Sequence, residues 1–72
     1  MKTLNDYTVV VMPDDGTYVA YVPALPGCHA VAYTPEEARA ELDGVFEMWR
    51  EEYAERGEPL PADIRPMIPV AS

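Results

Sequence analysis

The chain has 72 residues and a formal charge of −8, from 13 acidic against 5 basic side chains. This length allows one small domain, and the scattered Lys and Arg residues exclude the clustered positive charge that nucleic-acid phosphates require. We therefore expect no direct nucleic-acid binding by this chain, and a basic protein is the more natural partner.

Metal, disulfide and membrane signals are missing from the sequence. The single cysteine, Cys28, excludes an internal disulfide, and one His beside it leaves too few ligands for a structural zinc site. No stretch approaches the roughly 20 apolar residues that span a bilayer, and Met1–Asp6 lacks the apolar run of a signal peptide. We expect a cytoplasmic protein without a cofactor, a metal or membrane contact.

The first half of the chain has the composition of a β-hairpin. Residues 7–12 are rich in Val and have high strand propensity. The turn sequence Pro13-Asp14-Asp15-Gly16 follows, and the second strand is predicted from Thr17 to Val22.

A rigid connector follows this hairpin. Pro23 ends the second strand because it cannot donate to a ladder, and the third strand is predicted from Cys28 to Tyr33. Between them, Pro26 fixes φ and Gly27 tolerates positive φ, which favours a type II turn.

The clearest local signal is the start of a helix. Thr34 is a good N-cap, Pro35 suits the first helical position, and Glu37 completes a capping box. The helix is predicted to run to Arg56, with Gly57 as the residue that ends it.

The predicted helix is too long for the sheet. Its apolar stripe consists of Ala38, Leu42, Val45, Phe46, Trp49 and Tyr53. A helix of this length spans about 33 Å and a six-residue strand about 20 Å, so Trp49 and Tyr53 should overhang. The proline-rich segment 58–72 or a second protein must cover them. A close backbone approach would be one reason for Gly44 inside the helix.

The fold class follows from these elements. It is an α+β domain, in which a three-stranded antiparallel sheet packs on one long helix in the order β-β-β-α. Met67–Val70 could add a short edge strand, where a proline is allowed. One sheet face has mainly small residues on which a helix can lie: Tyr18, Ala20, Val22, Cys28, Ala30 and Ala32.

The opposite face is too apolar to be simply solvated, since it consists of Thr17, Val19, Tyr21, His29, Val31 and Tyr33. This face, the overhanging aromatic pair and the connector tip predict contact with another protein chain. The predicted contact residues are Tyr21, Leu25, Pro26, His29, Val31, Tyr33, Trp49 and Tyr53. A homo-oligomer (a dimer or tetramer) and a hetero-complex both satisfy the pattern.

Four motifs in order carry a family resemblance. They are Tyr7-Thr8-Val9-Val10-Val11 with Asp15-Gly16, the V-P-A-L-P-G-C-H stretch, Thr34-Pro35-Glu36-Glu37-Ala38, and Gly57-Glu58-Pro59-Leu60-Pro61. Over about residues 6–61 the chain resembles the HicB-like antitoxins. It departs from them at Ala32-Tyr33, where Gly-Asp is common, and at Glu41, where Asn is common.

This resemblance implies a partial ribonuclease-H-like fold and a place in a type II toxin–antitoxin pair. The implied partner is a HicA-like toxin, a small basic ribonuclease. Many HicB proteins add a C-terminal DNA-binding domain, for which 72 residues leave no room, so we do not expect autorepression. The alternative is a structural homo-oligomer of the same fold that has no toxin.

Catalysis is not expected. Ribonuclease-H chemistry needs carboxylates that converge on two metal ions, and residues 7–12 contain none. Asp14 and Asp15 suit a turn. Cys28 and His29 are adjacent in a strand, so their side chains point to opposite faces and cannot share a proton.

The helix acids leave two interpretations open. They are Glu41, Asp43, Glu47, Glu51, Glu52 and Glu55. They form either a docking surface for a basic partner or a solvated, solubilising face.

Overall fold

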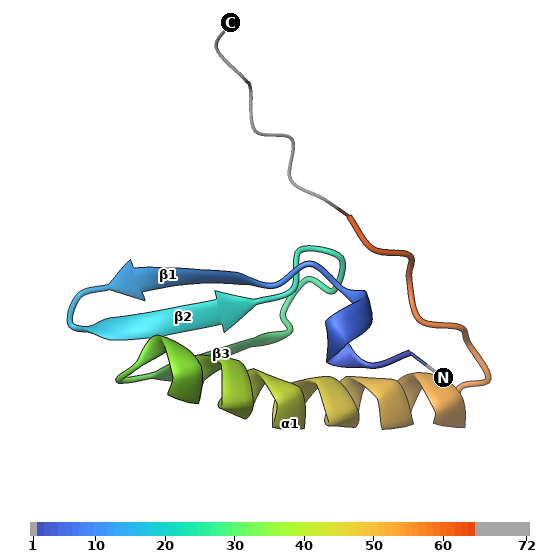
Figure 1. The fold of residues 1–72 in the computed structure, drawn as a ribbon. Helices are drawn as coiled ribbons and strands as arrows, with labels where there is room; N and C mark the ends of the chain where they lie inside the picture. Colours follow the sequence, from blue (N-terminus) through green and yellow to red (C-terminus); the bar gives the residue numbers. More distant parts are fainter. Residues whose placement is uncertain (1, 65–72) are drawn as a thin grey trace, which may run out of the picture.

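Three antiparallel strands form one sheet in the order β1-β2-β3, and one long helix packs against one of its faces (Figure 1). This computed structural model describes residues 2–64, so the strand predicted at Met67–Val70 lies outside the described residues. The elements are a short 3-10 helix η1 (Leu4–Asp6), β1 (Val10–Asp14), β2 (Thr17–Tyr21), β3 (His29–Ala32) and α1 (Pro35–Glu55). The predicted α+β order is confirmed.

A two-residue turn joins β1 to β2. Asp14 pairs with Thr17, which leaves only Asp15 and Gly16 in the loop. Their φ angles of 48° and 88° are those of a type I′ turn, whose twist matches that of the flanking strands. Gly16 is therefore required where φ is positive, as predicted.

The bounds of the first strand were predicted wrongly. The strand begins at Val10 rather than at residue 7, and it continues through Pro13 to Asp14. Pro13 and Asp14 join the ladder because the turn needs only the two residues after them. Residues 7–9 precede the strand, and the Tyr7 side chain lies in the core.

The connector contains the predicted turn. The Cys28 N–H donates to the Leu25 carbonyl oxygen at 2.9 Å. Gly27 has a φ of 93°, which a type II turn requires at its third position. The strands on either side are slightly shorter than predicted, because β2 ends at Tyr21 and β3 covers only His29–Ala32.

The start of α1 agrees with its sequence signal. The Thr34 hydroxyl accepts a hydrogen bond from the Glu37 N–H at 3.1 Å, and Pro35 is the first helical residue. This bond satisfies one of the backbone donors that a helix N-terminus leaves unpaired.

The end of α1 has the geometry of a Schellman motif. The Glu58 N–H donates to the Tyr53 carbonyl oxygen at 3.0 Å, and the Gly57 N–H donates to that of Ala54 at 3.1 Å. Gly57 takes a left-handed φ of 68°, as expected of the residue that ends a helix. Glu55 is the last helical residue and Arg56 is the cap, one residue short of the predicted bound.

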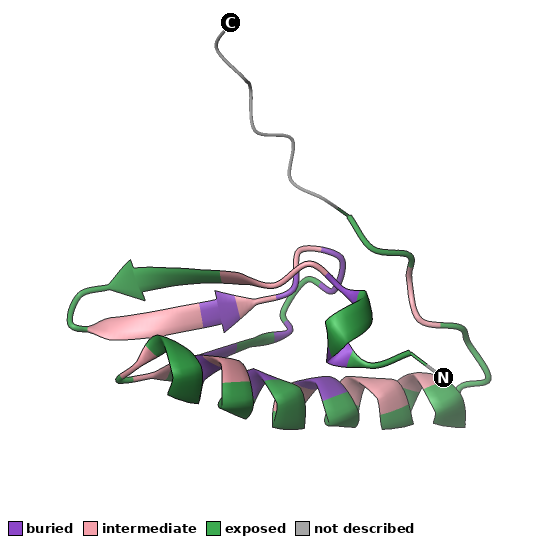
Figure 2. Ribbon diagram, viewed as in Figure 1, coloured by how far each residue is buried: buried purple, intermediate pink, exposed green. Residues whose placement is uncertain are grey.

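The core lies between the sheet and α1 (Figure 2). The small residues Ala20 and Ala30 are buried on the sheet face toward the helix, as predicted. Beyond them the core includes residues of the N-terminal segment and the connector. Its members are Leu4, Tyr7, Ala20, Val22, Ala24, Leu25, Cys28, Ala30, Ala38, Leu42 and Phe46.

The far half of α1 does extend past the strands, as the length argument predicts (Figure 1). The N-terminal segment covers it, because Leu4 is buried and the Tyr7 ring meets Phe46 edge-on with centroids 5.5 Å apart. The connector also lies close: a Cβ added at Gly27 would be 3.5 Å from the Trp49 ring. The sequence reasoning missed this role of the first residues.

The chain after α1 returns toward its beginning. The Tyr7 hydroxyl donates to the Pro61 carbonyl oxygen. The Asp63 carboxylate accepts from both the N–H and the hydroxyl of Thr8, each at 2.9 Å. Leu60, just before these contacts, packs against the core. The described part of the tail therefore supplies some of the cover that the sequence argument required.

Candidate protein-binding surfaces

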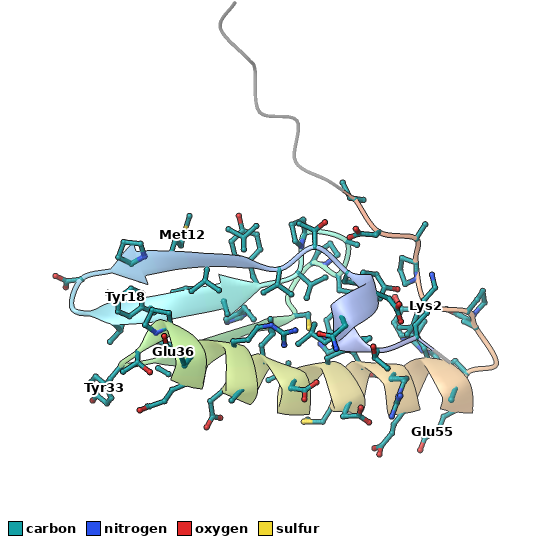
Figure 3. The ribbon with its side chains drawn as sticks, viewed as in Figure 1. Lys2, Met12, Tyr18, Tyr33, Glu36 and Glu55 are labelled. Atoms are coloured by element: carbon teal, nitrogen blue, oxygen red, sulfur yellow. The ribbon has the colours of Figure 1, made fainter. Side chains whose placement is uncertain are left out.

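The sheet face away from α1 carries an apolar surface, here called the outer face. It consists of Val10, Met12, Val19, Tyr21, His29 and Val31. Met12, Val19 and Val31 lie side by side in one cross-strand row. Met12 is 44% exposed and Val31 53% exposed. Figure 3 shows Met12 pointing away from the helix. No side chain of this set is an acid or a strongly basic group.

An open pocket of about 370 Å³ adjoins the outer face. It is lined by Val19, Tyr21, Val22, Pro23, Leu25, Pro26, Gly27, Cys28 and His29. Tyr21 lies directly opposite His29 in the sheet. The His29 ring is held by a 3.0 Å contact between its Nδ1 and the Gly27 carbonyl oxygen. The predicted contact residues Tyr21, Pro26 and His29 therefore meet in one place.

Leu25 is a correction to the predicted contact set. Although it is among the residues that line this pocket, its side chain is 0% exposed and belongs to the core, so it is not an apolar tip that projects toward a partner. The turn directs Leu25 inward, and Pro26 next to it is exposed. Alternation along the sequence could not reveal this, since the direction depends on how the connector folds over α1.

Trp49 and Tyr53 form a separate group near the end of α1. Their rings stack with centroids 6.2 Å apart, and the Arg56 guanidinium carbon lies 4.7 Å from the Tyr53 centroid. Both aromatic residues are half-buried. An open pocket of about 340 Å³ lies beside Tyr53, lined by Lys2, Arg50, Tyr53, Ala54, Glu58, Pro59 and Leu60. The predicted contact residues thus fall on two surfaces.

Tyr33 is one of the predicted contact residues that lie open to solvent. It is 78% exposed, just after β3. Figure 3 shows it at the end of the sheet near the start of α1, pointing away from the core.

The solvent side of α1 is strongly acidic and is here called the acidic face. Its carboxylates are all exposed: Glu36, Glu37, Glu41, Asp43, Glu47, Glu51, Glu52 and Glu55. With about 3.6 residues per turn, they lie around the side of the helix away from the buried Ala38, Leu42 and Phe46, with Glu41 and Glu52 at its flank. Within residues 2–64 one ion pair forms, between Arg50 and Glu47. Among the described residues, most of this negative charge therefore faces solvent outside any ion pair.

Gly44 lies in the middle of the acidic face. It is exposed, and a Cβ added there would meet nothing within 4 Å. No part of the described chain therefore makes the close backbone approach that was offered as one reason for Gly44. The exposed Ala40 lies one helical turn before it, so no long side chain projects from this part of the acidic face.

The titratable groups near the core do not form a reactive constellation. Burial raises the pKa of the Cys28 thiol, which keeps it protonated at neutral pH. His29 is exposed on the outer face, so the two side chains do point to opposite sides of the sheet. In the described part of the chain, no group of three or more His, Cys, Asp or Glu side chains is placed to hold a metal ion. The helix α1 is too polar to cross a membrane, and no other described helix is long enough to do so.

The β-β-β-α order, with one helix on one side of a three-stranded sheet, defines a small α+β domain with two exposed faces of opposite character. The family model described as UPF0150-like matches residues 2–61, and the chain belongs to this family. A UPF0150 protein of Thermoplasma acidophilum is 38% identical over 58 residues, which cover 79% of this chain and 84% of the relative.

Two UPF0150 proteins of Synechocystis sp. are also similar. One is 33% identical over 63 residues, or 86% of this chain and 80% of the relative. The other is 38% identical over 58 residues, or 79% of this chain and 80% of the relative. No solved structure matches the chain significantly.

Proposed function

We propose that this protein is an antitoxin-type binding protein that sequesters a small basic ribonuclease of HicA type. The observation that carries the proposal is the acidic face of α1, where exposed carboxylates line the helix and only Glu47 has an ion-pair partner among the described residues. A ribonuclease binds RNA phosphates with clustered Lys and Arg side chains. Carboxylates on a rigid helix can occupy the same cationic surface and so exclude RNA.

The spacing of the acidic face suits this role. Glu37 and Glu41 are four residues apart, as are Glu47 and Glu51. The two residues of each pair are therefore separated by about 6 Å along the helix axis. Between the two pairs, Gly44 adds no side chain. A partner backbone can therefore approach the helix closely there, with carboxylates on either side to receive its basic groups.

The family supports the proposal at a coarser level. The chain belongs to the UPF0150-like family, and its ordered motifs resemble those of the HicB-like antitoxins. In this proposal the protein acts in the cytoplasm by binding alone, without catalysis, cofactor or metal. The buried Cys28 and the exposed His29 are consistent with a non-catalytic chain.

The arrangement of the faces supports one of the two surfaces as the proposed binding site for the ribonuclease. The acidic face and the outer face lie on opposite sides of the molecule, because α1 covers the other side of the sheet (Figure 1). One small partner cannot cover both. We assign the ribonuclease to the acidic face, since the six residues of the outer face include no carboxylate and Asp14 alone adds one at its hairpin end.

Co-expression with a small basic ribonuclease of HicA type tests the proposal. Two results are expected: a complex that co-purifies, and rescue of growth from the toxin. The affinity of the complex should fall as the salt concentration rises, because salt screens the exposed charges that hold it together. Absence of both complex and rescue would contradict the proposed function.

A further inference from the structure

The two edges of the sheet differ in how they are protected. The strand order puts β1 at one edge and β3 at the other. An edge strand presents unpaired N–H and C=O groups, and natural proteins block such edges with prolines, charges or a covering element.

The β1 edge carries a blocking residue. In a hairpin with a two-residue loop, the residues that flank the loop, Asp14 and Thr17, form a hydrogen-bonded pair. Alternation then directs the backbone groups of Val11 and Pro13 away from β2. Pro13 has no N–H, so this edge lacks a donor where a further strand would need one.

The β3 edge has no such protection. The Val22 N–H donates to the Cys28 carbonyl oxygen at 3.1 Å, so Cys28 and the alternate residues Ala30 and Ala32 face β2. His29 and Val31 therefore direct their N–H and C=O groups outward. The strand His29–Ala32 contains no proline, Lys, Arg, Asp or Glu. Among the described residues no strand pairs with this edge.

We propose that β3 pairs antiparallel with β3 of a second copy of this chain, in a register centred on Val31. The two sheets then become one continuous six-stranded sheet around a twofold axis. Val31 lies opposite the second copy's Val31, which covers a side chain that is 53% exposed in the single chain. His29 lies opposite the second copy's Tyr33, a cross-strand aromatic pair on the outer face.

The charge distribution favours a second copy as the occupant. Each chain carries a charge of −8, so two copies can approach only where carboxylates are scarce. The strand His29–Ala32 itself contains no acid, whereas the hairpin turn has Asp14 and Asp15 and most of the remaining acids gather on α1, beginning with Glu36 and Glu37. This edge offers no carboxylate that would attract a basic partner. The inference does not rest on the proposed function, because it leaves the acidic face free.

Light scattering over a range of concentrations tests the dimer. The wild-type mass should approach twice the 8.0 kDa of one chain. Val31→Lys places two like charges face to face and should return the mass to 8.0 kDa. The matched control is Met12→Lys, which adds the same charge in the same cross-strand row but on β1, and it should leave the dimer intact.

Mixing two variants tests the register. Val31→Lys and Val31→Glu should each be monomeric. An equimolar mixture should regain the dimer, because residue 31 of one copy lies opposite residue 31 of the other and the two introduced charges then attract. Recovery in the mixture also shows that both variants are folded.

Amide hydrogen exchange provides a measurement without any substitution. Exchange of the Val31 amide should slow as protein concentration rises, while the outward Val11 amide on β1 should show no such change. A wild-type mass of 8.0 kDa at every concentration would overturn the inference. Equal dissociation by Met12→Lys and Val31→Lys would also overturn it, since that result indicates packing of the outer faces. A mixture that stays monomeric would overturn the register.

Discussion

The Tyr7 hydroxyl donates a hydrogen bond to the Pro61 carbonyl oxygen and so joins two segments 54 positions apart in the chain. The same ring packs edge-on against Phe46 of α1, with an interplanar angle of 67°. Tyr7 therefore connects the N-terminal segment, the helix and the chain that follows it. These three segments close the core where the strands do not reach.

Tyr7→Phe isolates the hydrogen bond from the packing. The substitution keeps the ring against Phe46 but leaves the Pro61 carbonyl without its donor. The free energy of unfolding, measured by urea denaturation, should fall by about 1 kcal/mol. Tyr33→Phe is the control. Because Tyr33 is 78% exposed, removal of its hydroxyl should change the free energy of unfolding little. Equal effects of the two substitutions would contradict the role given to Tyr7.

Stability should also depend on the ionisation of Tyr7. Burial, followed by the nearby carboxylates of Asp63 and Asp6, raises the pKa of Tyr7 above its ordinary value. A group with a raised folded-state pKa stabilises the protein below its unfolded-state pKa of about 10, and this contribution is lost as pH rises through the folded value. The free energy of unfolding should therefore fall above about pH 10 more steeply in the wild type than in Tyr7→Phe. Parallel pH profiles would refute this.

Leu25→Ala distinguishes a core residue from a docking residue. The side chain is 0% exposed, so its truncation should leave a cavity and lower the free energy of unfolding by about 2–5 kcal/mol. Pro26→Ala, at the exposed neighbouring position, should cost far less. A loss below about 1 kcal/mol for Leu25→Ala would show that the connector does not close on the core.

Two Gly→Ala substitutions should have opposite signs. Gly44→Ala should stabilise the free protein by about 1 kcal/mol, because the position is helical and a Cβ there meets nothing within 4 Å. Gly57→Ala should destabilise it, since Gly57 holds a left-handed φ of 68°. Thermal unfolding of both variants measures this. A destabilising Gly44→Ala would mean that the helix is packed closely at that point.

The sequence was sufficient where a feature depends on its immediate neighbours. The Thr34 cap, the turn at Gly27 and the helix end at Gly57 each need only the residues next to them, and all three were predicted. The bounds of β1 were wrong because the two-residue turn needs less of the chain than the Pro13-Asp14-Asp15-Gly16 signal suggests.

The sequence was insufficient where a side chain's direction depends on tertiary packing. Leu4 and Leu25 are buried because the N-terminal segment and the connector fold over the far half of α1, which no local pattern indicates. Of the predicted contact residues, Leu25 lies in the core and the others lie on two surfaces. Their separation depends on the path of the chain between the sheet and the helix end, which composition does not describe.

The acidic face of α1 is tested most directly by two double variants with equal loss of charge. Glu41→Gln with Glu51→Gln removes two carboxylates from the acidic face, and Asp14→Asn with Asp15→Asn removes two from the hairpin. The measurement is the affinity of each for the basic ribonuclease that co-purifies with the wild type. The helix pair should weaken binding about fivefold or more, equivalent to about 1 kcal/mol, while the hairpin pair should leave it nearly unchanged. Equal losses for the two pairs, or no loss for the helix pair, would contradict the assignment of the acidic face.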